Sequence, residues 1–378
     1  MAGVVSGEFF GKQTEASKRK SLIVSNYFSA WAKIMTSGKI DARRINYLDL
    51  FAGPGQYDDG SKSTPLLILD QVLNSQVLRV RTKMYFNDWD ATNIERLRKL
   101  FSNIDISPLS QKPEITNHDA AEYGTAIARA VVGYPTLSFV DPFGYRGVTQ
   151  DLLGQLITPF GSDCIFFFNY NEIQRHINNP KVSDHMMALF GVRRADQLRE
   201  LLAENDFTDK EEAILSLTAA AMRDVGGKHI LFFRFRDKDD SRTSHHLAFI
   251  SKNERGYNIM KEIMAKASSS VNKGVASLTY NKQAEIPKER QLSMFEEDPI
   301  ETLKTILLTR FSGQTVMVGK LPGLHSELAP MEAHNYVLSN YKAALKQLEA
   351  EGKLQTSRPQ RRFDTLADEI LIYFPNQS

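Results

Sequence analysis

The stretch INYLDLFAGPGQYDDG, residues 45–60, decides the fold of this 378-residue chain. Residues 45–51 form a short apolar and aromatic run, which is typical of a buried strand. The run stops at AGPG, where Gly53 and Gly55 let the backbone turn tightly and approach a ligand without a side-chain clash. Asp49 precedes them at the carboxyl end of the predicted strand. The stretch therefore predicts a strand followed by a glycine-rich binding turn.

Strands and helices alternate around this stretch. Upstream, apolar residues recur every three or four positions from Ser21 to Met35, which predicts an amphipathic helix. Downstream, the helix PLLILDQVL opens with Ser63 or Thr64 as N-cap and Pro65 in its first turn. Later segments repeat the pattern: TKMYFND, ATNIERLRKLF, EITNHDA, TAIARAVV, TLSFVDPFG and DCIFFFNYN. Such alternation predicts a parallel sheet that is covered by helices on both faces.

Two later segments depart from the alternation. Residues 172–225 are helical and polar in pattern, which predicts an insertion over the carboxyl edge of the sheet. After them, KHILFFRFR and HHLAFISK flank DKDDSRTS and predict an antiparallel hairpin. A parallel sheet closed by an antiparallel hairpin is the arrangement of the class I methyltransferase fold, whereas a simple nucleotide-binding sheet usually keeps all strands parallel. We assign this α/β, Rossmann-like domain to residues 1–280.

The C-terminal part has the order of a winged-helix domain. Residues 281–298 are charged without a sustained apolar pattern, which predicts a linker. Beyond it, residues 299–378 contain PIETLKTILLTRFSG, a helical stretch around 329–338, and NYKAALKQLEAEGKL, followed by a two-stranded wing after Gly352. Such a domain binds nucleic acid or docks a protein. A basic run without acids, where a wing would meet phosphates, favours nucleic acid; its residues are Lys353, Arg358, Arg361 and Arg362.

Composition excludes several classes of site. Cys164 is the only cysteine, which excludes an intramolecular disulfide framework and any metal site built from several cysteines. His245 and His246 are adjacent and would point to opposite faces of a strand, and His176 and His185 lack acidic ligands at metal spacing, so we expect no metal. No signal-peptide pattern and no membrane-spanning apolar run is present. We therefore expect a soluble, cytoplasmic protein.

Acidic residues follow the next two predicted strands. Asp88 in YFNDWD would accept hydrogen bonds from both hydroxyls of a ribose, with Asp90 as its replacement, or either acid would cap the following helix. Asp119 in NHDA would accept a hydrogen bond from an adenine amine, or would be a helix cap. No Gly-Lys-Ser/Thr sequence is present to hold phosphates. The predicted cofactor site comprises Asp49, Ala52, Gly53, Gly55, Asp88 and Asp119.

The strand LSFVDPFG ends in residues suited to methylation of an exocyclic amine. Asp141 and the Pro142 carbonyl would accept the two amine hydrogens and orient the nitrogen lone pair, while Phe143 would stack on the base and Gly144 completes the motif. No strong base is needed before attack, since the proton becomes acidic only as the methyl group arrives. The alternative is a rigid turn after a core strand.

Together these motifs resemble those of class I S-adenosylmethionine-dependent methyltransferases, with DLFAGPG as their first motif and DPFG as their fourth. The fourth departs from the common Asp-Pro-Pro-Tyr form, so the second aromatic side chain is missing. Asp-Pro-Phe-Gly is similar to the motif of tRNA guanine-dimethyltransferases. The resemblance implies S-adenosylmethionine as the cofactor and a base amine on RNA or DNA as the target.

A closer resemblance is to the bacterial three-Cys-motif partner (TcmP) family. It runs from FFGKQTEASKRKSLIVSNYFSAWAKIM through YLDLFAGPGQYDDGSKSTPLLIL and LSFVDPFG, with a more general likeness in the C-terminal domain. It implies association with a separate protein that carries a three-cysteine motif of the radical S-adenosylmethionine kind. It also implies that Thr14 and Lys20 close over the cofactor, although the polarity of a surface helix would explain both residues.

The sequence thus predicts an enzyme, a methyltransferase that acts on an exocyclic base amine of nucleic acid and works with a three-cysteine partner protein. The alternative is a non-catalytic scaffold that keeps the methyltransferase fold and binds a partner protein or nucleic acid through its winged helix.

Overall fold

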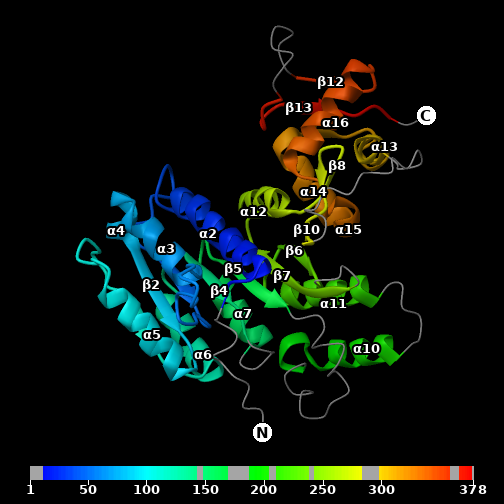
Figure 1. Ribbon diagram of the computed structural model, residues 1–378. Coiled ribbons are helices and arrows are strands. Elements are labelled where there is room, and N and C mark those ends of the chain that lie inside the picture. Colours follow the sequence, from blue (N-terminus) through cyan, green and yellow to red (C-terminus); the bar gives the residue numbers. More distant parts are fainter. Residues whose placement is uncertain are drawn as a thin grey trace. The chain divides into compact units, whose positions relative to one another are not determined.

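The computed structural model describes residues 12–142, 148–168, 187–203, 210–237, 242–282, 298–357 and 366–376 (Figure 1). The chain forms two compact units, residues 1–237 with 241–259 and residues 238–240 with 260–378. Five predicted site residues lie outside the described residues, namely Phe143, Gly144, Arg358, Arg361 and Arg362. Within the described ranges, no helix is both long and apolar enough to span a membrane.

The first unit is built on a mostly parallel sheet. Its strands lie in the order β6-β7-β5-β4-β1-β2-β3. Strands β1 to β5 pair in parallel, and β7 pairs antiparallel with both β5 and β6. The strands are β1 (Ile45–Asp49), β2 (Thr82–Asn87), β3 (Glu114–Thr116), β4 (Thr136–Val140), β5 (Asp163–Phe168), β6 (His229–Arg236) and β7 (Thr243–Ser251). This is the class I methyltransferase sheet, and the predicted fold is confirmed.

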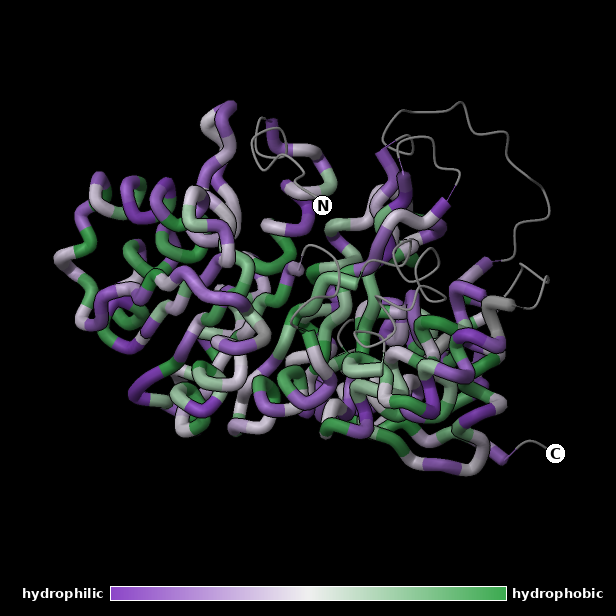
Figure 2. Tube along the Cα trace, turned by 90° about the horizontal axis from the view of Figure 1, so that it is seen from below, coloured by the Kyte–Doolittle hydropathy of each residue, from purple (hydrophilic) through white to green (hydrophobic). Residues whose placement is uncertain are grey.

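Helices cover both faces of this sheet. On one face, Phe28 of α2 packs edge-on against Tyr47, and Phe101 of α5 packs edge-on against Phe86. On the other face, buried residues of α6, α7, α10 and α11 form one core with Phe166 and other strand residues. Figure 2 shows mostly hydrophobic residues along the central strands, whereas hydrophobic and hydrophilic residues alternate along the helices. The helices are α2 (Glu15–Met35), α3 (Thr64–Leu73), α4 (Gln76–Arg81), α5 (Ala91–Ser102), α6 (Ala120–Val131), α7 (Gln150–Ile157), α10 (Val192–Ala203), α11 (Lys210–Asp224) and α12 (Glu254–Ala267).

Several element boundaries differ from the prediction. Helix α2 begins at Glu15, not at Ser21, because the Thr14 hydroxyl caps it by accepting a hydrogen bond from the Ser17 N–H at 3.0 Å. Strand β1 ends at Asp49 and leaves Phe51 in the turn. Helix α7 was not predicted, although parallel strands β4 and β5 need a crossover connection of this kind.

The second unit contains a winged helix. Its three-stranded sheet has the antiparallel order β11-β13-β12, and its core includes Leu303, Tyr341, Leu345 and Ile372. The elements are β8 (Val271–Asn272), β9 (Val275–Ala276), β10 (Thr279–Tyr280), α13 (Pro299–Arg310), β11 (Thr315–Met317), η2 (Val318–Lys320), α14 (Leu321–Leu328), α15 (Pro330–Ala333), α16 (Leu338–Ala350), β12 (Gln355–Thr356) and β13 (Leu371–Tyr373).

The second helix of this domain lies earlier than predicted. It is α14, which ends at Leu328, whereas the prediction placed a helix around 329–338. The cause is Pro330, which disfavours helical backbone at the residue before it; Ala329 accordingly has φ −148° and ψ 78°. Pro330 then begins the single turn α15.

Candidate functional site

Three predicted acids meet at the carboxyl edge of the parallel sheet. Asp49 ends β1 and lies opposite Phe86 of β2 and Phe139 of β4. Asp88 and Asp141 each lie two residues beyond those partners, so strand register brings all three carboxylates to one edge. Burial raises the pKa of the Asp49 carboxyl well above its ordinary value, and the nearby Asp141 and Asp88 charges add to the increase.

The glycine-rich turn is tied to this edge by its backbone N–H groups. The Phe51 N–H donates to Asp49 Oδ1 at 3.2 Å, and the Gly53 N–H donates to Asp88 Oδ2 at 2.8 Å. Gly53 has φ +65° and Gly55 has φ +82°, a left-handed conformation that glycine adopts without strain. The turn therefore lies directly over the ends of β1 and β2.

Asn87, which was not among the predicted site residues, joins the segments at the same edge. Its buried side-chain amide donates to the carbonyls of Leu50, at 3.2 Å, and His118, at 3.0 Å, while its Oδ1 accepts from the His118 N–H at 3.1 Å. One side chain thus links the residues that follow β1 and β3 to the last residue of β2. In the sequence it reads only as the polar end of a strand, and no motif marks it.

Asp88 is 1% exposed and already accepts three hydrogen bonds. Besides the bond from Gly53, its Oδ1 accepts from the Asp90 N–H at 2.9 Å and from the Asn93 amide at 3.4 Å. A carboxylate offers about four acceptor positions, so at most one remains for a ribose hydroxyl where two had been predicted. Burial raises the pKa of Asp88, against the effect of these bonds.

Asp90, the alternative residue for ribose binding, is the N-cap of α5. Its Oδ1 accepts a hydrogen bond from the Thr92 N–H at 2.8 Å, which is the alternative role considered for it. Asp119 is half-buried and precedes α6, where its backbone carbonyl accepts from the Tyr123 N–H at 2.9 Å. The two acids therefore lie at helix starts on the carboxyl side of β2 and β3.

Lys20 forms an ion pair with Asp141. The Lys20 Nζ lies 2.5 Å from Asp141 Oδ2, and the two side chains are only 16% and 20% exposed. The same ammonium lies 4.7 Å from the centroid of the Phe167 ring. Of the two N-terminal residues predicted near the cofactor, Lys20 reaches the acidic edge, whereas Thr14 is exposed and caps α2.

The two adjacent histidines and the cysteine pack within the first unit. The His245 ring stacks on Phe235 with centroids 4.5 Å apart, whereas the His246 Nε2 lies 3.0 Å from Glu211, so the two imidazoles do face opposite ways. Burial raises the pKa of the Cys164 thiol, as in an inert core cysteine. Among the described residues, no group of three or more His, Cys, Asp and Glu is placed to hold a metal ion.

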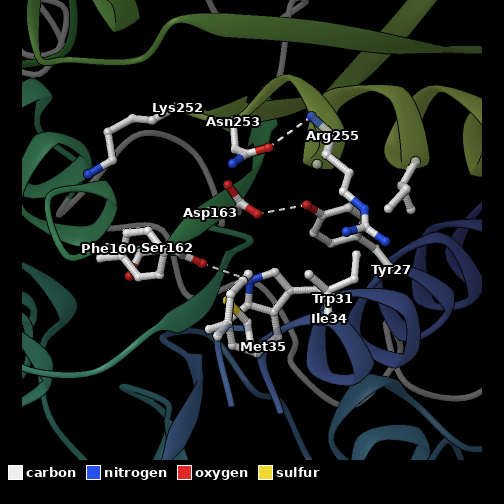
Figure 3. Close-up of a pocket in the computed structure, with 14 residues that line it drawn as sticks. Tyr27, Trp31, Ile34, Met35, Phe160, Ser162, Asp163, Lys252, Asn253 and Arg255 are labelled. Carbon is white, nitrogen blue, oxygen red and sulfur yellow. Dashed lines mark hydrogen bonds between the residues drawn. The ribbon is translucent and has the colours of Figure 1, made fainter. Parts of the chain in front are cut away.

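A pocket of about 310 Å³ opens at the opposite, amino edge of the sheet (Figure 3). Tyr27 and Trp31 of α2 form one side, and Lys252 and Arg255 extend from the segment after β7. The Tyr27 hydroxyl donates to Asp163 Oδ2 at 2.7 Å. Burial raises the pKa of the Asp163 carboxyl to about 6. None of the predicted site residues lines this pocket, so it is separate from the acidic edge.

Comparisons with known proteins support the C-terminal domain. The family model described as a GMT-like wHTH domain matches residues 279–361. No curated protein is similar to the chain in sequence.

Solved structures similar to the chain have low identities. The methyltransferase domain of the bacterial CtHen1-C is 12% identical, with TM-score 0.31, over 61% of this chain and 98% of that one. An S-adenosylmethionine-dependent methyltransferase from Agrobacterium tumefaciens is 12% identical, with TM-score 0.34, over 62% of each chain. A spermidine synthase from Thermotoga maritima is 12% identical, with TM-score 0.32, over 72% of this chain and 70% of that one. At these scores the likenesses carry no argument about the reaction, which has to come from the residues themselves.

Proposed function

We propose that the chain is an S-adenosylmethionine-dependent methyltransferase that acts on an exocyclic amine of a nucleic-acid base. The observation that carries the proposal is the meeting of Asp49, Asp88 and Asp141 at the carboxyl edge of a sheet with this strand order, beneath the Gly53 turn. Open α/β sheets bind their ligands at this edge.

The residues at the edge fit the cofactor. Asp88 keeps one acceptor position for a ribose hydroxyl, and Gly53 brings backbone without a side chain to the same place. Asp49 adds a second buried carboxyl group at the same edge, and Asp119 would accept from the adenine amine. When bound, S-adenosylmethionine supplies the methyl group as an electrophile.

Asp141 would orient the acceptor. Its carboxylate already accepts a hydrogen bond from an ammonium, that of Lys20, so it is placed to accept one from an exocyclic amine. The Pro142 carbonyl would accept the second hydrogen, which leaves the nitrogen lone pair free to attack. As the nitrogen takes up the methyl group, the N–H bond would become acidic and its proton would pass to the Asp141 carboxylate, so the chain needs no strong base.

The winged helix would bring the polymer. The GMT-like wHTH match supports a nucleic-acid role, and the exposed Lys353 lies two residues before β12, where the wing begins. Arg358, Arg361 and Arg362 belong to the same proposed contact. From the resemblance to the three-Cys-motif partner family, we include a separate three-cysteine protein as a partner.

Calorimetric titration with S-adenosylhomocysteine, the demethylated product, tests this function. We expect the wild type to bind and Asp88→Ala to lose at least about tenfold in affinity, or about 1.4 kcal/mol. Asp90→Ser is the matched control, because serine retains the N-cap of α5 and the ribose acceptor is untouched. No binding by the wild type at millimolar ligand would refute the enzyme and leave the scaffold interpretation.

A further inference from the structure

We propose that Phe167 and Asp141 form the subsite for the acceptor, and that the Lys20 ammonium fills this subsite until a planar ring with an exocyclic amine displaces it. The inference rests on the proposed function and names the acceptor's chemical class. It also assigns Phe167, which none of the motifs contains, and it gives Lys20 a role other than closing over the cofactor.

Strand register places Phe167 beside Asp141. Val140 of β4 lies opposite Phe166 of β5, so the next residues along these parallel strands, Asp141 and Phe167, are neighbours. Side chains alternate along a strand, and Phe166 and Phe168 both belong to the core on the α7 face. Phe167 therefore faces the α2 side, and it is the one residue of β5 that is not fully buried.

Lys20 makes both contacts that an amine on a base would need. Its nitrogen donates to Asp141 Oδ2 at 2.5 Å and lies 4.7 Å from the centre of the Phe167 ring. A hydrogen-bond acceptor beside an aromatic face is also what binds an exocyclic amine attached to a stacked ring. The Lys20 ammonium therefore occupies the position where the amine and ring of a methyl-accepting base would lie.

Helix packing fixes the position of Lys20. Helix α2 runs along β5 in the opposite direction: Tyr27, about two turns after Lys20, bonds Asp163 at the start of β5, while Lys20 reaches the strand's far end. Near Lys20, the Ser21 hydroxyl accepts a hydrogen bond from the Thr64 hydroxyl at 3.2 Å. Moving the Lys20 side chain would free Asp141 Oδ2 and the Phe167 ring from the contacts that its ammonium makes with them.

Other aromatic rings pack beside Phe167. The His245 ring lies 4.6 Å from it, and Phe235 stacks on His245 at 4.5 Å with an interplanar angle of 18°. Burial lowers the pKa of His245 well below its ordinary value, with the Lys20 charge acting in the same direction, so the imidazole is neutral. Packing against the uncharged His245 ring restricts the movement of the Phe167 side chain.

Nucleoside binding without any cofactor tests the subsite. We titrate adenosine, cytidine and guanosine, which carry exocyclic amines, and uridine, which does not. We expect Lys20→Met to tighten binding of at least one amine-bearing nucleoside by about tenfold, because the competing ammonium is gone, and Phe167→Leu to weaken it by about tenfold through lost stacking. Lys18→Met, which removes an exposed lysine from the same helix, is the control and should change nothing.

Two results would overturn the inference. One is a Lys20→Met variant that binds these nucleosides no better than the wild type, and the other is uridine binding as tightly as the amine-bearing nucleosides. Thermal unfolding of each variant shows whether it is folded, and Asp141→Asn supplies a second test should Phe167→Leu fail to fold, since it should weaken amine binding. Titration with S-adenosylhomocysteine distinguishes failure of the subsite from failure of the proposed function. If this ligand binds but the variants do not change nucleoside affinity, only the subsite is refuted. If this ligand does not bind, the proposed function is refuted.

Discussion

A methyl group added at Gly55 should be far more costly than one added at Gly60, five residues along the same turn. Both residues have positive φ, +82° and +84°. Alanine in this conformation costs about 1–2 kcal/mol at either position. A Cβ at Gly60 would meet nothing within 4 Å, whereas one at Gly55 would lie 2.6 Å from Leu97 Cδ1 and 3.3 Å from Leu100 Cδ1.

The difference between the two variants isolates this overlap. Leu97 is fully buried, so its side chain cannot move aside freely, and overpacking of this kind costs about 1–3 kcal/mol. We therefore expect Gly60→Ala to lose about 1–2 kcal/mol and Gly55→Ala about 2–5 kcal/mol of unfolding free energy. Urea unfolding followed by tryptophan fluorescence measures both, since Trp31 is buried in the first unit. Equal losses in the two variants would refute the packing of the turn against α5.

Three further predictions concern titration and salt. Because the pKa of Asp163 is raised to about 6, the folded state binds a proton more tightly than the unfolded chain, and the free energy of unfolding falls as pH rises from about 4 to 6. Asp163→Asn should remove this loss, which is on the order of 3 kcal/mol. Urea unfolding measures it, and a difference between wild type and variant that does not change with pH would contradict the prediction. Burial lowers the pKa of Lys261 to about 7, so stability of the second unit should rise between pH 7 and 10, and Lys261→Met should flatten that profile in thermal melts. Nucleic-acid affinity measured by mobility shift should fall steeply between about 50 and 200 mM salt, because phosphate contacts release counterions. Lys353→Ala should reduce the slope of log affinity against log salt concentration by about one. Binding that does not depend on salt would count against phosphate contacts.

The fold was predictable because its signals are local. Apolar runs such as residues 45–51 and 163–168 mark strands by themselves, and the AGPG turn marks where the first one stops. The parallel direction of these strands then follows from the alternation of strand and helix. The errors arose where a neighbouring residue overrides the pattern, as at Pro330, which shifts the end of α14, and at Thr14, whose cap extends α2.

The site was predictable only in part. Acids at strand ends can be found from the sequence, because parallel strands bring their carboxyl ends together, and Asp49, Asp88 and Asp141 were found in this way. Contacts between segments that are distant in the sequence cannot be predicted from such local patterns. Lys20 and Asp141 are 121 residues apart, and only the packing of α2 along β5 joins them. Asn87 was missed for the same reason, because its partners, Leu50 and His118, follow two other strands.

The most direct test of the central claim is transfer of a labelled methyl group. The full-length chain is incubated with methyl-labelled S-adenosylmethionine and pooled RNA or DNA, which is then digested to nucleosides and separated. We expect label on a nucleoside methylated at its exocyclic amine, and loss of that label with Asp141→Asn while S-adenosylhomocysteine still binds. Label that persists in the Asp141→Asn variant, or that sits on a ring carbon or a ribose oxygen, would contradict it.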